Sequence, residues 1–152
     1  MTGPAEKSPK ARVRPAQLTD ADRIAVLSGQ LGYPSSAASV RRRLRNLLAR
    51  RDHAIWVAET DGGTIAGWIH VFVKQLLESD REVEIGGLVI DENFRGQGVG
   101  KALVERAERW AKSRQLKSVY VRSNIVRNDA HIFYQKLGYK VIKTQYAFKK
   151  AI

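Results

Sequence analysis

The sequence contains no cysteine, which excludes disulfides, thiolate metal sites and a cysteine nucleophile. Acidic residues are also few: the chain has 15 Asp and Glu and 27 Lys and Arg, which gives a net charge of +12. Such an excess attracts nucleic acid, acidic membranes or phosphate-bearing ligands without choosing among them. No apolar run approaches the roughly 20 residues of a membrane span, so no membrane-spanning segment is predicted, and no membrane is expected as a partner. The lack of cysteine suits a cytoplasmic location.

Length and composition indicate one folded domain. A chain of 152 residues, 43% of them hydrophobic, is long enough to bury a hydrophobic core without disulfide bonds. Residues 1–10 contain no apolar stretch and are expected to form a disordered basic tail. Residues 11–152 are expected to form the domain.

Hydrophobic periodicity predicts a mixed α/β arrangement of four helices and seven strands. Ser35 or Ser36 is expected to cap the second helix. The helices are expected near residues 20–31, 36–50, 99–115 and 129–137. The strands are expected near residues 12–15, 54–58, 64–73, 83–90, 118–122, 139–142 and 145–148.

The most informative segment joins an expected strand to an expected helix. It reads Leu88-Val-Ile-Asp-Glu-Asn-Phe-Arg-Gly-Gln-Gly-Val-Gly-Lys101. Its glycines, Gly96, Gly98 and Gly100, allow positive φ angles and the close approach of a ligand to the main chain. The first amides of the following helix are unpaired and lie at the positive end of its dipole, and Arg95 adds a cationic fork. The segment therefore predicts a binding site for a pyrophosphate.

Two common phosphate-binding motifs do not fit this segment. Lys101 occupies the position of the third glycine in the dinucleotide fingerprint, and residues 118–122 offer no acid to bind a ribose. In the P-loop pattern, Arg95 replaces the first glycine and Ala102 replaces the hydroxyl residue that binds magnesium. A turn that merely reverses the chain is the alternative to a phosphate site.

The run Arg95-Gly-Gln-Gly-Val-Gly100 resembles the R/Q-x-x-G-x-G/A signature of the GNAT superfamily of N-acetyltransferases. Strand Leu88–Ile90 leads directly into it, as in that superfamily. Downstream, Ala130–Tyr139 resembles the family's A-x-x-F/L-Y-x-K-x-G-F/Y segment. The run Asn124–Tyr134 is similar to one in aminoalkylphosphonate N-acetyltransferases and many uncharacterised relatives. The resemblance extends from Arg12 to the C-terminus.

The resemblance implies a GNAT fold, with a mixed seven-stranded sheet and about four helices, in which parallel strands 83–90 and 118–122 splay apart. Acetyl-CoA would enter between these strands as a co-substrate. Its pantetheine would pair with strand 88–90 like an added strand, and the Val89 N–H would point at the thioester oxygen. The amides of residues 95–101 would hold the pyrophosphate. The implied coenzyme contacts are Leu88, Val89, Ile90, Arg95, Gly96, Gln97, Gly98, Val99, Gly100, Lys101, Asn124 and Phe133.

Amine acetylation needs a base that deprotonates the amine and a donor that protonates the leaving thiolate. The resemblance implies Tyr134 as the donor, and a phenol with an ordinary pKa near 10 is suitable; packing in the core is its alternative role. Glu84 occupies the position of a catalytic glutamate in several GNAT members. Strand alternation is expected to place Glu84, Gly86 and Leu88 on one face. Glu82 or a chain of waters is the alternative base.

One position departs from the family pattern. Many relatives place an asparagine that contacts coenzyme A where this chain has Arg127. Asn128 is expected to cap a helix that begins at Asp129, so Arg127 and Asn124 are the candidates for that contact. The pair Gly86–Gly87 inside an expected strand indicates a bulge or a close approach of ligand.

The acceptor site is expected to involve the N-terminal helices and the loop after Val73. The arginine-rich face of the second helix would suit an amine that bears a carboxylate or phosphonate, but a solvated cationic surface is the favoured interpretation. A polycationic aminoglycoside fits a protein of this charge poorly. His53, His70 and His131 show no ligand spacing with nearby carboxylates, so no metal site is expected, and His70 is interpreted as a structural residue of the sheet.

The sequence thus predicts an N-acetyltransferase that moves the acetyl group of acetyl-CoA to a primary amine of a small acceptor. Direct attack would proceed through a tetrahedral intermediate. Members of the family often pair as homodimers, but no apolar patch in this sequence specifies such a pairing. One alternative is an acetyl-CoA-binding domain without catalysis. The other is a basic nucleic-acid-binding module, which would explain the charge but not the joint presence of Arg95, the three glycines and Tyr134.

Overall fold

The computed structural model describes residues 11–152, and the tail expected at residues 1–10 lies outside this range. The chain divides after Val121 into a larger and a smaller compact unit, and each is described by itself. The larger unit contains β1 (Ala11–Pro15), α1 (Ala21–Gln30), α2 (Ala37–Leu48), β2 (His53–Thr60), β3 (Ile65–Leu76), β4 (Ser79–Ile90), α3 (Val99–Ser113) and β5 (Val119–Val121). The smaller unit contains α4 (Asn128–Lys136). All four expected helices are therefore confirmed.

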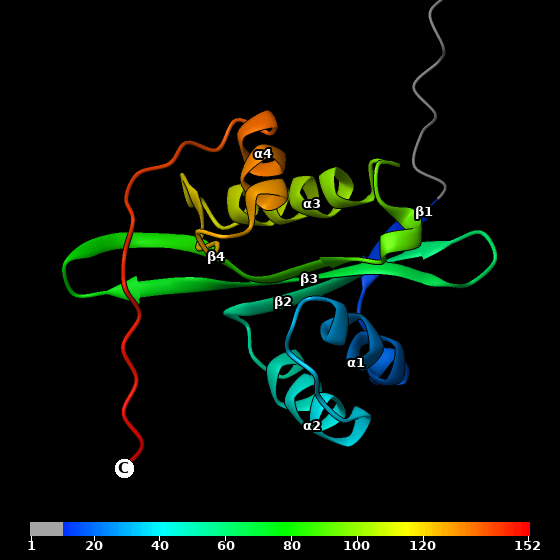
Figure 1. Cartoon of the computed structure of the whole chain (residues 1–152). Coiled ribbons are helices and arrows are strands. Elements are labelled where there is room, and N and C mark those ends of the chain that lie inside the picture. The colour runs from blue at the N-terminus through cyan, green and yellow to red at the C-terminus, as the bar shows by residue number, and fades with distance from the viewer. Residues whose placement is uncertain (1–10) are drawn as a thin grey trace, which may run out of the picture. The chain divides into compact units, whose positions relative to one another are not determined.

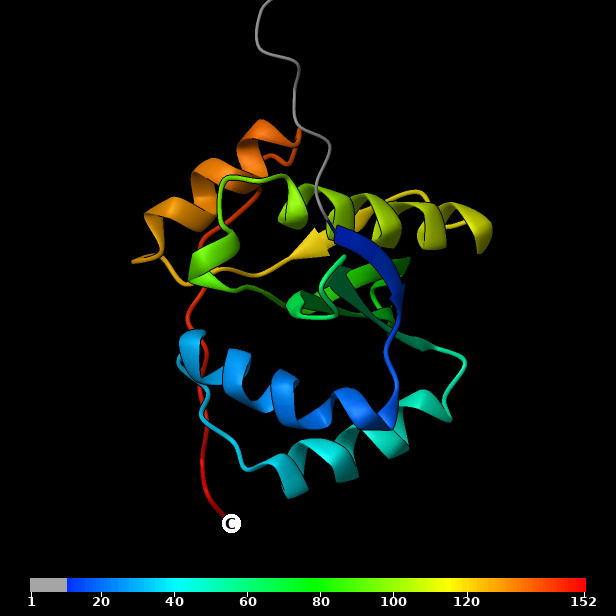
Figure 2. The same ribbon diagram turned by 90° about the vertical axis from the view of Figure 1, so that its right-hand side faces the viewer.

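The sheet of the larger unit has the strand order β1-β2-β3-β4-β5. Neighbouring strands are antiparallel except β4 and β5, which are parallel. Helices α1 and α2 cover one face of this sheet, and α3 covers the other (Figures 1 and 2). The mixed α/β arrangement predicted from the sequence is confirmed for these elements.

Local signals account for the helix boundaries. The Ser36 side chain accepts a hydrogen bond from the Ser39 amide at 3.1 Å and so caps α2. Along α3, Leu103 and Ala107 recur at helical spacing and are fully buried. On the opposite face of the sheet, Leu27 of α1 and Leu44 of α2 belong to the buried core. Each helix therefore presents one apolar stripe to the sheet.

The sheet has five strands among the described residues rather than the seven expected. The segments 139–142 and 145–148, predicted to be the closing strands, form no secondary structure. Their apolar side chains are exposed: Val141 by 73%, Tyr146 by 91% and Phe148 by 93%. An apolar, β-branched and aromatic composition gives a segment the tendency to form a strand, but a strand exists only where a partner pairs with it. The prediction for these two segments was therefore wrong.

The expected loop after Val73 is also absent. Strand β3 continues to Leu76 and β4 begins at Ser79, with Leu76 and Ser79 paired in register. The two strands thus form one long hairpin with a turn at residues 77–78, and the polar residues from Ser79 onward are already part of β4. The loop that was expected to contribute to the acceptor site is therefore part of the β3–β4 hairpin.

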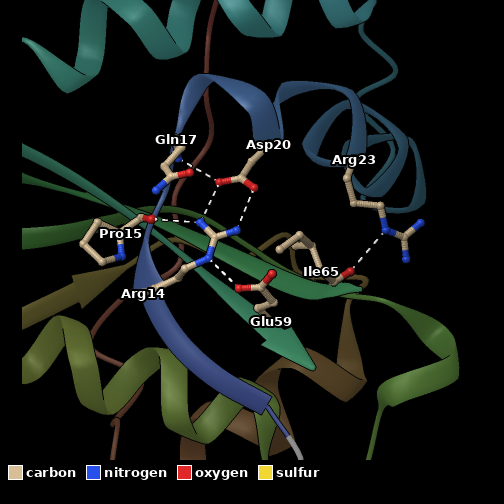
Figure 3. Close-up of polar contacts among 7 residues, drawn as sticks. All are labelled: Arg14, Pro15, Gln17, Asp20, Arg23, Glu59 and Ile65. Atoms are coloured by element: carbon tan, nitrogen blue, oxygen red, sulfur yellow. Dashed lines mark hydrogen bonds and ion pairs between the residues drawn. The ribbon is translucent and has the colours of Figure 1, made fainter. Parts of the chain in front are cut away.

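A group of charged side chains fastens the first strand to the start of α1 (Figure 3). The Arg14 guanidinium donates two hydrogen bonds of 2.9 Å to Asp20 and one of 2.7 Å to Glu59. The Asp20 carboxylate also accepts from the Gln17 amide at 2.7 Å. Burial tends to raise the pKa of Asp20, but the hydrogen bonds from Arg14 and Gln17 outweigh it and hold the pKa below its usual value.

We expect Asp20→Asn to lower the free energy of unfolding by about 2 kcal/mol at pH 7, because it removes charge-assisted hydrogen bonds at a nearly buried site. A carboxyl group with a lowered pKa stabilises the fold above its unfolded pKa, and this stabilisation is lost as the pH falls through its folded pKa. The difference from wild type should therefore disappear in strong acid. Urea unfolding at several pH values measures it.

The matched control for this variant is Asp22→Asn. Asp22 is 75% exposed and lies 3.9 Å from the guanidinium of Arg41, so its removal should change stability by less than about 0.5 kcal/mol. Equal effects of the two substitutions, or an Asp20→Asn effect that persists in strong acid, would contradict this role of the Asp20 charge.

Candidate active site

Strand β4 has an open edge next to β5. On one side, β4 pairs with β3 from Ser79 to Ile90. On its other side, the pairing with β5 among the described residues is confined to Val83–Ile85. Within the described range, residues 11–152, the backbone of residues 86–90 therefore has no strand partner on the β5 side. An extended ligand can add to such an edge through main-chain hydrogen bonds. The pantetheine arm was expected at this edge, which is open because β5 ends at Val121.

A β-bulge interrupts β4 at its glycine pair. His70 pairs with Gly87 and Val71 with Ile85, so Gly86 is the additional residue. The bulge confirms one interpretation of the Gly86–Gly87 pair. A Cβ on Gly87 would lie 2.8 Å from the Trp68 ring, so only glycine lets this ring lie against the bulge.

The bulge also changes the face on which Glu84 lies. Partners directly across a ladder share a face, so Glu84 lies with Phe72, while Leu88 lies with Ile69 on the opposite face. The expectation that Glu84, Gly86 and Leu88 share one face was wrong, because one additional residue reverses the alternation. As a result, Glu84, which is 4% exposed, lies on the face that α1 and α2 cover.

Buried polar contacts fix the end of β4 where the glycine-rich turn begins. The Asp91 carboxylate is 3% exposed, accepts the Asn93 amide at 3.1 Å and pairs with Arg23 of α1. The Arg23 guanidinium also donates to the Ile65 carbonyl at 3.1 Å. The hydrogen bond from the Asn93 amide contributes most to lowering the pKa of Asp91, and Arg23 adds to it. Helix α1 thus holds the strand end that leads into the turn.

The glycine-rich turn has the backbone conformation that its sequence predicts. Gly96 and Gly98 have φ angles of 74° and 81°, in the region that favours glycine. The Ala102 amide donates to the Gly98 carbonyl at 3.0 Å, so the amides of residues 99–101 precede the hydrogen-bond ladder of α3. Arg95 is exposed beside them, and its Nε donates to the Ile90 carbonyl at 3.4 Å. These groups form a site suited to a phosphate anion.

A cavity of about 320 Å³ lies between α1, α2 and the sheet. Its apolar lining includes Ile24, Val40, Leu44 and Ile55. It also reaches the bulge, because Gly86, Gly87, Trp68 and His70 line it. The buried indole N–H of Trp68 has no hydrogen-bond partner among residues 11–152. Sequence reasoning expected the acceptor near these helices but gave no signal for a cavity.

Two histidines from neighbouring strands meet beside the bulge. His53 Nδ1 and His70 Nε2 lie 2.8 Å apart, and both rings lie close to Phe72. Burial, with a contribution from His53, lowers the pKa of His70 to about 4, and burial also lowers the pKa of His53. His70 is therefore neutral at physiological pH. Its Nδ1 lies 3.2 Å from the position that a Cβ on Gly86 would occupy.

The smaller unit contains the remaining predicted residues. Tyr134 of α4 is half-buried and contacts Phe133 and Tyr139 edge to face. Burial raises the pKa of Tyr134 to about 12, although the charge of Arg127 opposes the shift. The phenol therefore keeps its proton throughout the neutral and mildly alkaline range. Asn124 uses its side-chain oxygen to accept the Val126 amide at 3.1 Å.

Helix α4 begins one residue earlier than expected. It starts at Asn128 with Arg127 in the capping position and no side-chain hydrogen bond there. The carbonyl of Asn124 accepts the Arg127 amide at 3.0 Å and a ring nitrogen of His131 lies 2.9 Å from it. This turn brings Asn128 into the helix, so the prediction that Asn128 caps it was wrong.

Comparison with known proteins decides the family. The sequence profile described as the Acetyltransferase (GNAT) family matches residues 22–139. The chain belongs to this family. Membership confirms the resemblance found in the sequence and places the chain in a class of acetyl-CoA-dependent N-acetyltransferases.

Relatives with curated descriptions support this membership of the GNAT family. An uncharacterised N-acetyltransferase from Chlorobaculum tepidum is 30% identical over 135 residues, which cover 88% of this chain and 78% of that protein. N-acetylaspartate synthetase from Danio rerio is 31% identical over 85 residues, which cover 56% of this chain. The match spans only 29% of the length of the synthetase.

Solved structures support the GNAT fold. An aminoglycoside N-acetyltransferase AAC(6′)-Iy, in complex with CoA, has a TM-score of 0.82 to this chain at 18% identity. The superposition covers 93% of this chain and 95% of that one. At this identity the similarity concerns the fold alone.

Within this GNAT chain, the structure brings several predicted residues together. The open edge of β4 at Leu88, Val89 and Ile90 leads through Asp91 into the glycine-rich turn. Sequence reasoning missed Arg23 and Asp91, which lie 68 residues apart and whose pairing has no local signal. Among residues 11–152 there is no group of three or more potential metal ligands. None of the helices in that range has the length and apolarity needed to cross a bilayer.

Proposed function

We propose that this chain transfers the acetyl group of acetyl-CoA to a primary amine of a small acceptor that carries an anionic group. The observation that carries this proposal is the continuity between the open edge of β4 and the glycine-rich turn. An extended pantetheine arm fits the open edge of β4, and a pyrophosphate fits the glycine-rich turn. Family membership supports the same co-substrate.

In this proposal the pantetheine pairs with residues 88–90, and the amides of residues 95–101 bind the pyrophosphate beside Arg95. The Leu88 N–H, on the open side of β4, stabilises the oxyanion that forms on the thioester carbonyl. The Val89 N–H, expected for this role from the sequence, faces β3 instead, because the Asp91 amide donates to the Ala66 carbonyl and successive N–H groups of a strand alternate in direction. Asn124 and Phe133 complete the coenzyme contacts. The support for these roles is the resemblance of the motifs, together with the unpaired backbone of this part of β4.

The reaction begins when Glu84 takes a proton from the acceptor ammonium, so that the nitrogen lone pair becomes available. The amine then attacks the thioester carbon and forms a tetrahedral intermediate. As the carbon–sulfur bond breaks, the electron pair leaves with sulfur, and Tyr134 donates its proton to the thiolate. The nitrogen releases its second proton, which restores the phenol of Tyr134 through solvent. The products are an amide and free coenzyme A. The raised pKa of Tyr134 keeps it protonated at neutral pH.

An anionic acceptor agrees with the charge of the chain, which is +12. The relatives named N-acetylaspartate synthetase are named for an acetylated amine that carries carboxylates. A positively charged protein attracts such an acceptor and repels a polycation at low ionic strength. This is the chemical reason to test anionic amines first.

The test is the release of free thiol from acetyl-CoA in the presence of a panel of small amines, some with and some without a carboxylate or phosphonate. We expect release that depends on the amine, matched by the gain of one acetyl group on that amine in mass spectrometry. Reactions without an amine give the background hydrolysis. If the folded protein binds acetyl-CoA but acetylates no amine on the panel, transfer to a small amine is rejected.

A further inference from the structure

The cavity between α1, α2 and the sheet is bounded by two chemically different ends. At one end it is lined by Gly86 and Gly87, the bulge residues of β4, and by His70. At the other it is lined by residues of α2 and of the segment before it, including Ser35 and Arg43. The bulge end adjoins the stretch of β4 proposed to bind the thioester. A ligand in the cavity can therefore present one group to the bulge and another to α2.

As far as the structure describes the chain, the lining of the cavity consists of apolar, hydroxyl-bearing and basic residues and contains no acidic residue. Arg43 is exposed, and its guanidinium donates to the Ser35 hydroxyl at 3.2 Å. Among residues 11–152, Arg43 has no acidic partner within ion-pair distance. The hydrogen bond to Ser35 holds this charge at the cavity, where it attracts an anion. Its remaining N–H groups can bind a carboxylate in a bidentate manner.

The volume of the cavity indicates the size of the group that it can enclose. A water-sized group takes about 30 Å³, so about 320 Å³ holds about ten such groups. That is the size of one apolar amino acid and is smaller than an aminoglycoside with several rings. The apolar side chains of Val40, Leu44 and Ile55 suit a hydrocarbon body.

The bulge end suits an uncharged or hydrogen-bonded amine. His70 is neutral at physiological pH, and its Nε2 is engaged with His53. Its Nδ1 lies toward Gly86 and can take part in a hydrogen bond with an amine. Glu84, the proposed base, lies on this same face of the sheet. His70 is thus a positioning residue for the group that is to be acetylated.

From these observations we propose that the cavity binds an acceptor with a single amine, an apolar body and an anionic end, with the amine beside His70 and the anion paired with Arg43. This inference rests on the proposed acetyl transfer and names the class of its acceptor. Among the described arginines of α2, only Arg43 lines the cavity, so this proposal assigns acceptor binding to Arg43 and not to the other arginines of the helix.

The test compares the binding of 4-(aminomethyl)benzoate and of 4-(aminomethyl)benzamide by calorimetry, without acetyl-CoA, because these probes carry the amine and the anionic group at opposite ends of an apolar ring. The two probes share the amine and the apolar body and differ in the anionic group. We expect the carboxylate to bind at least tenfold more tightly, since a charge-assisted bidentate contact is lost in the amide. Arg43→Gln should bring the two affinities within twofold of each other. The matched control is Arg42→Gln, an exposed arginine of α2 that does not line the cavity, and it should keep the wild-type preference.

Equal binding of acid and amide by wild-type protein, or an unchanged preference in Arg43→Gln, would overturn the proposed acceptor class. Tighter binding of kanamycin than of 4-(aminomethyl)benzoate would overturn it as well. If one of these results were found but other amines still caused thiol release from acetyl-CoA, the proposed acetyl transfer would remain supported. Selective binding of the carboxylate without thiol release would instead support the cavity and reject acetyl transfer to this class.

Discussion

Glu84→Gln should lower kcat by about 10²- to 10⁴-fold at pH 7, the usual contribution of a general base. The substitution keeps the size of the side chain but removes its ability to accept the ammonium proton. Glu84 is 4% exposed and shares its strand face with Phe72. Affinity for acetyl-CoA should change by less than twofold, because the proposed coenzyme contacts begin at Leu88. Steady-state kinetics and calorimetry measure the two quantities.

The pH profile separates a base from a structural residue in this position. Without a base, the variant depends on the small fraction of acceptor that is already deprotonated. Its rate should then rise about tenfold per pH unit until the pH reaches the pKa of the amine. A variant that is merely misfolded would lose activity equally at every pH.

Glu82→Gln is the matched control and tests the alternative base. Glu82 precedes Glu84 by two residues, and its carboxylate lies 3.0 Å from Lys74 Nζ and 2.9 Å from the Ser118 hydroxyl. We expect this variant to keep near wild-type turnover. A large loss in Glu82→Gln together with normal turnover in Glu84→Gln would move the role of base to Glu82. Normal turnover in both would indicate that water accepts the proton.

Tyr134→Phe should lower kcat by about 10²- to 10⁴-fold, because the thiolate then leaves without a proton donor. The change removes one hydroxyl and keeps the ring between Phe133 and Tyr139, so stability should change little. Since the pKa of Tyr134 is raised to about 12, its ionisation should not limit the wild-type rate below about pH 11. Kinetics across the pH range measure both effects.

The control for Tyr134 is Tyr146→Phe, because Tyr146 is 91% exposed and has no assigned role. This variant should turn over like wild type. Wild-type kcat in Tyr134→Phe would reject the phenol as the proton donor. A fall in acetyl-CoA affinity equal to the fall in kcat/KM would instead make Tyr134 a binding residue.

Local signals in the sequence predicted the helices and the turn well. The cap at Ser36, the stripe along α3 and the positive φ angles of Gly96 and Gly98 follow from interactions between residues close in sequence. The bulge at Gly86–Gly87 also had a local signal, because glycine is rare inside strands. Contacts between distant segments had none. The pairing of Arg23 with Asp91 and of His53 with His70 depends on how strands and helices are brought together.

The errors have the same origin. The composition of residues 139–148 favours strands. A strand also needs a pairing partner, however, and that partner lies elsewhere in the chain, where a short stretch of sequence gives no information about it. The face of Glu84 was wrong because alternation was counted through the bulge as though β4 were regular. The roles of Glu84, Tyr134 and the coenzyme-binding residues stay predictions. So do the cytoplasmic location and the homodimer.

The most direct test of the account is calorimetric titration of the wild-type protein with acetyl-CoA, repeated for Arg95→Ala and Arg109→Ala. Both arginines are exposed, but only Arg95 lies at the glycine-rich turn. The account predicts micromolar binding by wild type, binding weakened tenfold or more in Arg95→Ala, and no change in Arg109→Ala. Absence of binding by the folded wild-type protein, or equal affinity in all three, would contradict a coenzyme site at this turn.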